Sequence, residues 1–357
     1  MTDFIPTAGV AASRPLTERA GAAGHRPPSQ GDVAALAGVS TQTVSRVVNN
    51  RTNVDGETRE RVLSAMRMLG YRANTAARAL ATGQFHTLGV ISFDLSAYGN
   101  ARTLQAISQA AQDADYSVNV TCARSQTEGA VRQAFSKLTS QAVDGIILIE
   151  AQILDRPGLQ LPHGVPVVVV DGDPDRRFHT VDSNQTDGAR AATEHLLKLG
   201  HRTVWHLAGP QDAFSARRRA AAWHGALKAA GAPVPAVLYG DWSAQSGYEA
   251  GRKIAAREDV TAVFAGNDHM ALGLIRALSE AGRRVPDDVS VVGYDDVAEA
   301  EFFLPPLTTV RQNFDEVGRR CVSLLLDQIH SGREAAGGVH SVPPKLVVRT
   351  STAPRRG

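Results

Sequence analysis

The stretch Asp32-Val-Ala-Ala-Leu-Ala-Gly-Val-Ser-Thr-Gln-Thr-Val-Ser-Arg-Val-Val-Asn49 contains two short amphipathic patterns. They cover residues 32–37 and 41–49, with apolar side chains three and four positions apart, which is typical of helices. Gly38 stands between them, where a sharp turn requires a residue that tolerates positive φ. The stretch therefore predicts two helices joined by a tight turn, as in a helix-turn-helix.

A third helical pattern, residues 57–69, follows and ends before Gly70. Side chains that cap helix N-termini precede the second and third patterns at Ser40 and Asp55, and glycine commonly ends a helix. The apolar faces supply Val33, Leu36, Val39, Val44, Val47, Val48, Val62, Leu63, Met66 and Leu69. We therefore expect a small three-helix module over residues 29–73.

Positive charge is concentrated in this first region. The whole chain of 357 residues has a formal net charge of only +2, so its bulk charge does not attract nucleic acid. Between Ser29 and Gln84, however, seven arginines stand against four acidic residues. A local basic module of this kind is typical of DNA binding.

The rest of the chain has a different pattern. Residues 1–28 are rich in Pro and Gly and lack apolar periodicity, which predicts a disordered N-terminal arm. After Gln84, β-rich runs alternate with amphipathic helices, which predicts two parallel sheets built from βαβ units with a cleft between them. The expected strands are Thr87–Phe93, Ser117–Thr121, Gly145–Ile149, Pro166–Val170, Val204–Ala208, Ala262–Ala265 and Ser290–Tyr294.

Composition excludes several other classes of protein. Cys122 and Cys321 lie far apart, without metal or redox spacing, which favours a reducing compartment. The sequence has no apolar run of membrane-spanning length and no export signal, so we expect a cytoplasmic protein without membrane contact. It also offers no catalytic residue set, no metal site and no cofactor motif.

The helix-turn-helix stretch resembles that of the LacI/GalR family of transcription repressors. The resemblance continues through Thr58-Arg-Glu-Arg-Val62, Gly70-Tyr-Arg-Ala-Asn74 and Ala77-Arg-Ala-Leu-Ala81. It implies a helix-turn-helix domain over residues 29–73, a hinge helix and linker over residues 74–84, and an effector-binding and dimerisation domain over residues 85–357. The last domain would have the fold of periplasmic binding proteins, with two parallel-sheet subdomains.

In such a protein the second helix enters the major groove. Thr41, Gln42 and Arg46 would then meet base edges, since Gln pairs bidentately with adenine and Arg with guanine. Short polar side chains around them suit phosphate contacts; these are Ser40, Thr43, Ser45, Asn49 and Asn53. The alternative is that Gln42 and Arg46 are ordinary solvated surface residues.

Two further features of the DNA-binding part follow from the resemblance. Relatives usually have an apolar residue and a polar or aromatic residue where this chain has Gln30 and Gly31, so we expect a first helix that is anchored less firmly. In the family the hinge helix, which includes Ala77, forms on operator DNA, and the residue matching Leu80 wedges between base pairs in the minor groove. Two hinge helices are needed, so the partner is a second copy on a near-palindromic operator.

The resemblance also covers the sensor, through Leu199-Gly-His-Arg202, Ala208-Gly-Pro210, Asn267-Asp-His-Met-Ala-Leu-Gly273, Val291-Val-Gly-Tyr-Asp-Asp296 and Pro305-Pro-Leu-Thr-Thr-Val310. A sugar site needs a flat apolar surface and charged partners for vicinal hydroxyls. The residues expected to bind effector are Tyr98, Asp171, Ser215, Arg219, Trp242, Asn267, His269, Asp295 and Phe314. Of the two adjacent aspartates, we expect only Asp295 to face the ligand.

Simpler roles remain open for some of these residues. Trp242 could pack a surface loop, Phe314 could belong to the core, and Asp295 with Asp296 could be a turn. His269 has no metal-ligating partner four residues away, so it is not expected to bind a metal. Relatives often have Gln or another polar residue at this position.

The sequence thus predicts a dimeric repressor that a sugar or glycoside releases from double-stranded operator DNA. The chain ends without leucine heptads, so no tetramerising coiled coil is expected. One alternative is a sugar sensor or solute-binding protein without specific DNA binding. A glycosidase that uses Asp295 with Asp171 is the other, but nothing sets an acid and a base apart, so we expect no enzyme.

Overall fold

The structure is a computed structural model that describes residues 26–48, 51, 53–71, 83–123, 125, 127–149, 164–172, 178–332 and 337–355. It contains two compact units, residues 1–77 and 78–357, which are considered separately. Asn49, Ala77 and Leu80 lie outside the described residues, as do most of the expected arm and hinge helix. None of the helices described is long and apolar enough to cross a membrane.

The first unit contains three helices, α1 (Gln30–Ala37), α2 (Thr41–Val48) and α3 (Gly56–Leu69). Their shared core buries Val33, Val44 and Val62 completely. The three helices begin and end within two residues of the predicted positions. The reason is that capping side chains at helix starts and glycines at helix ends act on neighbouring residues in the sequence.

Local contacts fix the ends of these helices. Ser29 and Asp32 form a reciprocal capping box, with the Ser29 backbone N–H donating to Asp32 Oδ2 at 2.7 Å. Gly38 has a φ of 66° and Gly70 a φ of 63°, so both end their helices in the left-handed region. The capping box satisfies the N-terminus of α1 although Gln30 and Gly31 stand where relatives have an apolar residue and a polar or aromatic residue, and the expectation of a less firmly anchored first helix stays a prediction.

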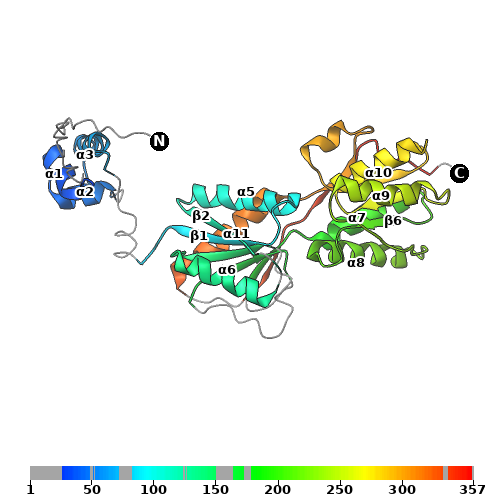
Figure 1. Ribbon diagram of the computed structural model, residues 1–357, viewed down its shortest axis with the longest axis horizontal. Coiled ribbons are helices and arrows are strands. Elements are labelled where there is room, and N and C mark those ends of the chain that lie inside the picture. The colour runs from blue at the N-terminus through cyan, green and yellow to red at the C-terminus, as the bar shows by residue number, and fades with distance from the viewer. Residues whose placement is uncertain are drawn as a thin grey trace, which may run out of the picture. The chain divides into compact units, whose positions relative to one another are not determined.

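The second unit is built from two sheets (Figure 1). Sheet A has the order β11-β5-β4-β3-β1-β2 and all its described pairings are parallel. Its strands are β1 (Thr87–Ser92), β2 (Ser117–Cys122), β3 (Gly145–Ile149), β4 (Val167–Val170), β5 (His179–Asp182) and β11 (Val339–Ser341). Helices α5 (Tyr98–Asp113) and α11 (Phe314–Ser331) cover one face, and α6 (Glu128–Ser140) covers the other.

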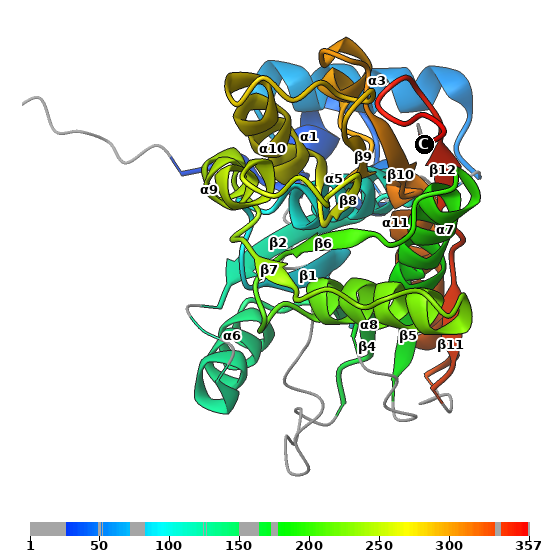
Figure 2. The same cartoon turned by 90° about the vertical axis from the view of Figure 1, so that its right-hand side faces the viewer.

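Sheet B has the order β12-β10-β9-β8-β6-β7, and only β12 runs antiparallel to its neighbour. Its strands are β6 (Trp205–Ala208), β7 (Leu238–Tyr239), β8 (Ala262–Ala265), β9 (Ser290–Asp295), β10 (Thr308–Arg311) and β12 (Lys345–Val347). Helices α7 (Gln185–Lys198) and α8 (Phe214–Ala229) cover one face (Figure 2). Helices α9 (Ala244–Ala255) and α10 (Asp268–Glu280) cover the other.

The chain crosses between the two sheets three times, from β5 to α7, from β10 to α11 and from β11 to β12. Each sheet with its helices therefore forms a lobe, here called lobe A and lobe B, and the crossovers join the lobes. Ligands of parallel α/β sheets bind beyond the carboxyl ends of the strands. The predicted fold class, a small helical module followed by two parallel-sheet subdomains, is confirmed.

Candidate functional site

The exposed face of α2 carries the predicted base-reading side chains. Thr41, Gln42 and Arg46 are exposed, whereas Val44 and Val47 on the opposite face are buried in the three-helix core. This division follows from the helical period, which puts residues three and four apart on one face. The fold therefore presents one polar and one cationic long side chain on a rigid support.

The smaller polar residues around α2 differ in their surroundings. The Ser40 hydroxyl caps α2 by accepting a hydrogen bond from the Thr43 backbone N–H at 3.1 Å, and it lies 2.9 Å from the Thr43 hydroxyl. Ser45 is half-buried and Asn53 is exposed. Ser40 therefore has a structural task at the start of the helix in addition to the predicted phosphate contact.

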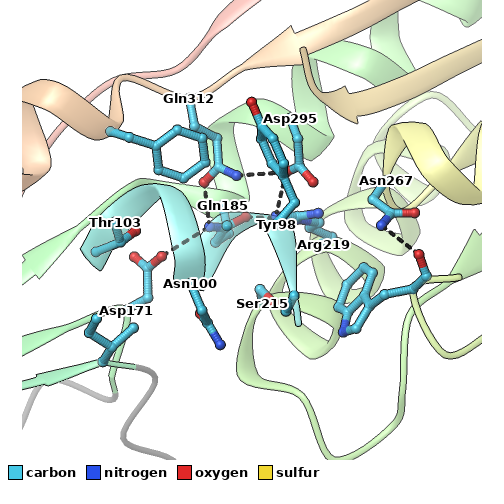
Figure 3. A pocket seen from close by; sticks show the side chains of 15 residues that line it. Tyr98, Asn100, Thr103, Asp171, Gln185, Ser215, Arg219, Asn267, Asp295 and Gln312 are labelled. Atoms are coloured by element: carbon cyan, nitrogen blue, oxygen red, sulfur yellow. Dashed lines mark hydrogen bonds and ion pairs between the residues drawn. The ribbon is translucent and has the colours of Figure 1, made fainter. Parts of the chain in front are cut away.

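A cleft in the second unit brings together eight of the nine residues expected to bind effector (Figure 3). Tyr98 and Phe314 begin helices of lobe A, Asp171 follows β4, and the other five belong to lobe B. The cleft encloses about 40 Å³. These eight residues are Tyr98, Asp171, Ser215, Arg219, Trp242, Asn267, Asp295 and Phe314.

His269 does not line the cleft. Its ring lies 6.2 Å from the ring of Tyr98, which does line the cleft, in an edge-on arrangement. The described residues contain no group of three or more side chains that could hold a metal ion. His269 is therefore placed to support Tyr98, and Tyr98 in turn packs edge-on to Phe314 at 6.1 Å.

The backbone is strained where the cleft side chains are attached. Asp171, Trp242 and Asp295 have φ values of 46°, 73° and 108°, in a region that L-residues other than Asn and Asp rarely adopt. Such strain is retained where surrounding contacts enforce it, commonly at functional sites. Here it turns three side chains into one cleft, namely Asp295 at the end of β9, Asp171 directly after β4 and Trp242 three residues after β7.

A buried hydrogen-bond chain links the two lobes across the crossovers. The Asp171 carboxylate accepts from the Ser183 backbone N–H at 2.7 Å and from the Ser183 hydroxyl at 2.6 Å. Gln185 Nε2 lies 3.2 Å from Asp171 Oδ2 and donates to Gln312 Oε1 at 2.9 Å. Gln312 Nε2 in turn donates to Asp295 Oδ1 at 2.8 Å. Asp171 in lobe A is thus connected to Asp295 in lobe B.

Arg219 closes this network from the lobe B side. Its Nε donates to Gln185 Oε1 at 2.7 Å, and its guanidinium also donates to the Gly266 carbonyl. An Arg219 nitrogen lies 3.6 Å from Asp295 Oδ1, with both side chains almost fully buried. The guanidinium lies 3.6 Å from the centre of the Tyr294 ring, which supports it from below.

Two opposing influences act on the pKa of Asp295. Burial raises the pKa of Asp295, while the nearby Arg219 charge and the Gln312 hydrogen bond act in the opposite direction. Asp296 faces away from the cleft and forms ion pairs with Arg311 and Arg349. The structure therefore places only the first of the two aspartates in the cleft.

Trp242 forms an apolar wall of the cleft. Its ring lies directly over Gly209, where an added Cβ would come within 2.3 Å of the ring. Its carbonyl accepts a hydrogen bond from Asn267 Nδ2 at 3.0 Å, while Asn267 Oδ1 caps α10. Trp242 is thus held in the cleft wall, and Phe314 lines the same cleft although it is only 7% exposed.

Helices α5 and α8 both begin at the cleft, one from each lobe. Their N-cap residues are Ala97 and Ala213, and neither helix has a capping side chain. The N–H groups of a first helical turn carry partial positive charge and need acceptors. The cleft therefore offers backbone donors from both lobes to oxygen atoms of a ligand.

The sequence did not identify several residues that line the cleft. Gln312 directly follows β10 and Gln185 is the third residue after β5, and the short polar sequences of these two crossover strands gave no strand signal. Asn100 and Thr103 lie one helical turn apart on α5, and that spacing was the only signal available. Ala97, Gly99 and Ile149 complete the lining.

Two family descriptions match this chain. Residues 31–74 match the lacI family of bacterial regulatory proteins, and residues 193–352 match the periplasmic binding protein-like domain. The first match covers the three-helix unit with α2, and the second covers most of lobe B.

Curated relatives match nearly the whole chain. The lactose operon repressor of Escherichia coli K12 is 38% identical over 90% of this chain and 89% of its own length. The transcriptional regulator CelR of Thermobifida fusca is 36% identical over 91% of this chain and 97% of its own length.

Solved structures agree with these matches. The lac repressor dimer bound to operator and the anti-inducer ONPF has a TM-score of 0.83 and 37% identity, covering 92% of this chain and all of the other. A complex of CelR with cellobiose has a TM-score of 0.67 and 34% identity, covering 91% of this chain and 99% of the other. The protein described here belongs to the lacI family of bacterial regulatory proteins.

Proposed function

We propose that this protein is a cytoplasmic, dimeric transcription repressor that binds a near-palindromic operator and releases it when a sugar or glycoside occupies the cleft. The observation that carries the proposal is the pairing of two features in one chain. The exposed polar face of α2 is suited to base edges, and the rings and hydrogen-bonding groups that line the cleft of the second unit are the kinds of group that bind a polyol.

On the DNA side, Thr41, Gln42 and Arg46 read base edges in the major groove. Each bidentate contact of this type discriminates against a wrong base by about 1–3 kcal/mol. Leu80, which lies outside the described residues, is proposed as the minor-groove wedge, as the family resemblance implies. The DNA-bound lac repressor in the solved structure is a dimer.

A second copy is also the proposed occupant of an apolar patch on lobe B. Phe302 and Leu304 are 76% and 88% exposed at the end of the short 3₁₀ helix Ala298–Phe302. Large apolar side chains that are this exposed and adjacent commonly mark an interaction surface. A symmetric dimer would cover the patch and bring two DNA-binding units to one operator.

On the effector side, the cleft combines the Trp242 and Phe314 rings with a dense set of hydrogen-bonding groups. Neutral sugars have apolar C–H faces and many hydroxyls, so they match this combination. Among the solved relatives, the lac repressor holds the anti-inducer ONPF together with operator and holds ONPG in the repressed state, and CelR holds cellobiose. We propose that the effector here is a neutral sugar or glycoside and that it releases DNA.

Binding without catalysis fits the two carboxylates of the cleft. Asp171 accepts hydrogen bonds from Ser183 and Gln185, and Asp295 is held by Gln312 and Arg219. A glycosidase needs one carboxyl group free to donate a proton and another free to attack or activate water. We therefore propose that the protein is not an enzyme.

The test is fluorescence anisotropy of the full chain with DNA fragments from upstream of its own gene, at two salt concentrations and with a panel of mono- and disaccharides. We expect tight, salt-sensitive binding to one fragment. One sugar should weaken it by about 5–150-fold, the usual range of allosteric coupling. Arg46→Ala should weaken operator binding by about 10–100-fold, because it removes a base contact.

The matched control is Arg67→Ala, which removes an exposed arginine of α3 that pairs with Glu60. It should leave operator affinity nearly unchanged. Equal losses in Arg46→Ala and Arg67→Ala would show that only bulk charge matters. Sugar binding without any specific DNA binding would favour the alternative, a sensor that has lost DNA recognition.

A further inference from the structure

A second cavity, of about 630 Å³, adjoins the effector cleft. Four side chains line both cavities and so form the wall between them: Tyr98, Asp295, Gln312 and Phe314. Sites for small molecules usually measure about 300–1,000 Å³. We call this cavity the crossover chamber, because the β10–α11 and β11–β12 crossovers contribute to its lining.

Four cationic side chains from different parts of the chain line the crossover chamber. They are Arg102 of α5 in lobe A, Arg311 at the end of β10, Lys345 at the start of β12, and Arg349. Because these residues are far apart in the sequence, only the fold brings their charges together.

Two of these cations are placed directly opposite each other. Arg311 and Lys345 are register partners on the antiparallel strands β10 and β12. Opposed residues project from the same face of a sheet, and like charges in that arrangement destabilise the pairing. Both residues are exposed, and the Arg311 side chain remains 56% exposed despite its ion pair with Asp296. A bound anion between them would relieve this repulsion.

The buried acidic residues of the chamber are already occupied. Asp296, with a side chain only 4% exposed, forms ion pairs with both Arg311 and Arg349, the latter at 2.7 Å. One negative charge therefore neutralises only part of the charge of two guanidinium groups. Asp295 is engaged by Arg219 and Gln312 on the cleft side of the wall.

Two exposed carboxylates, Glu301 and Asp315, also line the chamber. Within the described part of the chain, neither forms an ion pair with any of the four cations. Their charge limits where an anion can sit, and the favoured position is beside the opposed pair Arg311 and Lys345.

Arg102 and Lys345 each have N–H donors that form no hydrogen bond among the described residues. The Arg102 Nε is buried and has no hydrogen-bond partner, although Nη1 of the same side chain donates to Gln105 at 2.7 Å. Among the described residues, Lys345 has neither an ion pair nor a side-chain hydrogen bond. A buried Nε faces no open volume, so the Arg102 nitrogen available to an anion in the chamber is Nη2, which forms no hydrogen bond among the described residues.

We propose that the crossover chamber binds a small anion with a phosphate or carboxylate group, held by Lys345, Arg311 and Arg102. The site is separate from the sugar contacts of the cleft and goes beyond the proposed function. Because Arg102 belongs to lobe A and Lys345 to lobe B, a bound anion ties the two lobes together. The protein would thus respond to an anionic metabolite as well as to its sugar effector.

The test is isothermal titration of the full chain with inorganic phosphate and pyrophosphate, at constant ionic strength set with chloride. We expect saturable binding by the unmodified protein. Lys345→Gln and Arg102→Gln should each weaken it roughly tenfold, the effect of losing one charge-assisted hydrogen bond. The control Lys228→Gln removes the same charge from an exposed position near the end of α8, and should leave phosphate affinity unchanged.

A second arm identifies the source of the anion by comparing glucose 6-phosphate with glucose. If inorganic phosphate binds equally well to Trp242→Ala, the anion is an independent ligand. If only glucose 6-phosphate binds, and both Lys345→Gln and Trp242→Ala weaken it, the anion is a substituent of the effector. The absence of saturable binding by all three phosphates, or unchanged affinity in Lys345→Gln, overturns the proposal. Because no DNA is present, this result is independent of operator binding.

Discussion

Arg46 and Arg219 show how differently the two units of this protein build a functional surface. Arg46 stands exposed on α2, above a small apolar core, and the local helix alone decides its direction. Arg219 is 4% exposed and is held by a glutamine of α7, the carbonyl of Gly266 after β8, and a carboxylate and an aromatic ring of β9. The DNA-binding surface is therefore specified locally, whereas the effector cleft depends on the whole second unit.

This contrast has consequences for stability. An exposed arginine contributes little to folding, because its charge stays solvated whether or not the chain is folded. A buried arginine paired with a carboxylate is different, since removing one partner leaves the other charge buried and uncompensated. The same residue type should thus behave as a pure recognition group in one unit and as a structural group in the other.

The largest expected effect is that of Arg219→Ala. It leaves the Asp295 carboxylate buried and deprives Gln185 and the Gly266 carbonyl of their donor. The free energy of unfolding of the second unit should fall by about 3–5 kcal/mol. Urea unfolding followed by tryptophan fluorescence measures this, since all three tryptophans lie in the second unit.

Two further variants make this comparison sharper. Arg46→Ala should change the free energy of unfolding by less than about 0.5 kcal/mol. The double variant Arg219→Met with Asp295→Asn should recover part of the loss, because it removes both charges together. If Arg219→Ala and Arg46→Ala cost the same, the buried network does not stabilise the second unit.

The second-largest expected effect is a pH dependence of the free energy of unfolding, which comes from a histidine that does not line the cleft. His206 on β6 is fully buried, stacks on Phe264 at 4.7 Å and has no partner at Nε2. Burial lowers the pKa of His206 to about 4. Above its ordinary value of 6.5 the imidazole is neutral in both folded and unfolded chains, so it adds no pH dependence there.

Between about pH 6.5 and 4, the unfolded chain binds a proton that folded His206 does not. The free energy of unfolding should therefore fall by up to about 3 kcal/mol over this window. His206→Leu should flatten the slope, while other buried histidines such as His201, whose pKa burial also lowers, retain a part of it. Urea unfolding at pH 4.5 and 7.5 checks this, and an unchanged slope in His206→Leu would contradict it.

The pH effect also separates the two units. The first unit has no histidine between Ser29 and Gln84, so acid should weaken the second unit at a pH where this mechanism leaves the three helices untouched. Tryptophan fluorescence follows the second unit alone, whereas circular dichroism sums the helices of both units, so a circular dichroism transition without a change in fluorescence reports the first unit.

The first unit could be predicted from the sequence more completely than the second unit. The three helices were predicted to within two residues of their ends, because Ser29, Asp55 and Gly70 act on neighbouring backbone groups. The longer apolar strands were also predicted. The sequence did not indicate β5 or β11, because His179-Thr-Val-Asp182 and Val339-His-Ser341 have no apolar run and become strands by adding in turn to the edge of β4.

The cleft shows the same limit. Aspartates at strand ends, such as Asp171 and Asp295, could be expected to face a ligand, since the ends of parallel strands converge. Gln185 and Gln312 could not, because they meet across 127 residues of sequence through crossover strands that were not predicted. His269 lies in the expected helix but beside Tyr98, and this position depends on how the lobes pack.

The smallest expected effect tests the local character of the first unit at a single glycine. Gly38 ends α1 with a φ of 66° and has open space where a Cβ would lie, so Gly38→Ala suffers only backbone strain. It should lower the free energy of unfolding of the first unit by about 1 kcal/mol. Gly56→Ala is the matched control, with equally open space but ordinary helical backbone. That variant should keep or slightly raise stability.

Thermal unfolding followed by circular dichroism compares the two variants, and equal behaviour would mean that the turn does not depend on the conformation of Gly38. A loss confined to the helical transition, with tryptophan fluorescence unchanged, would show that the DNA-binding unit can be weakened without disturbing the sensor.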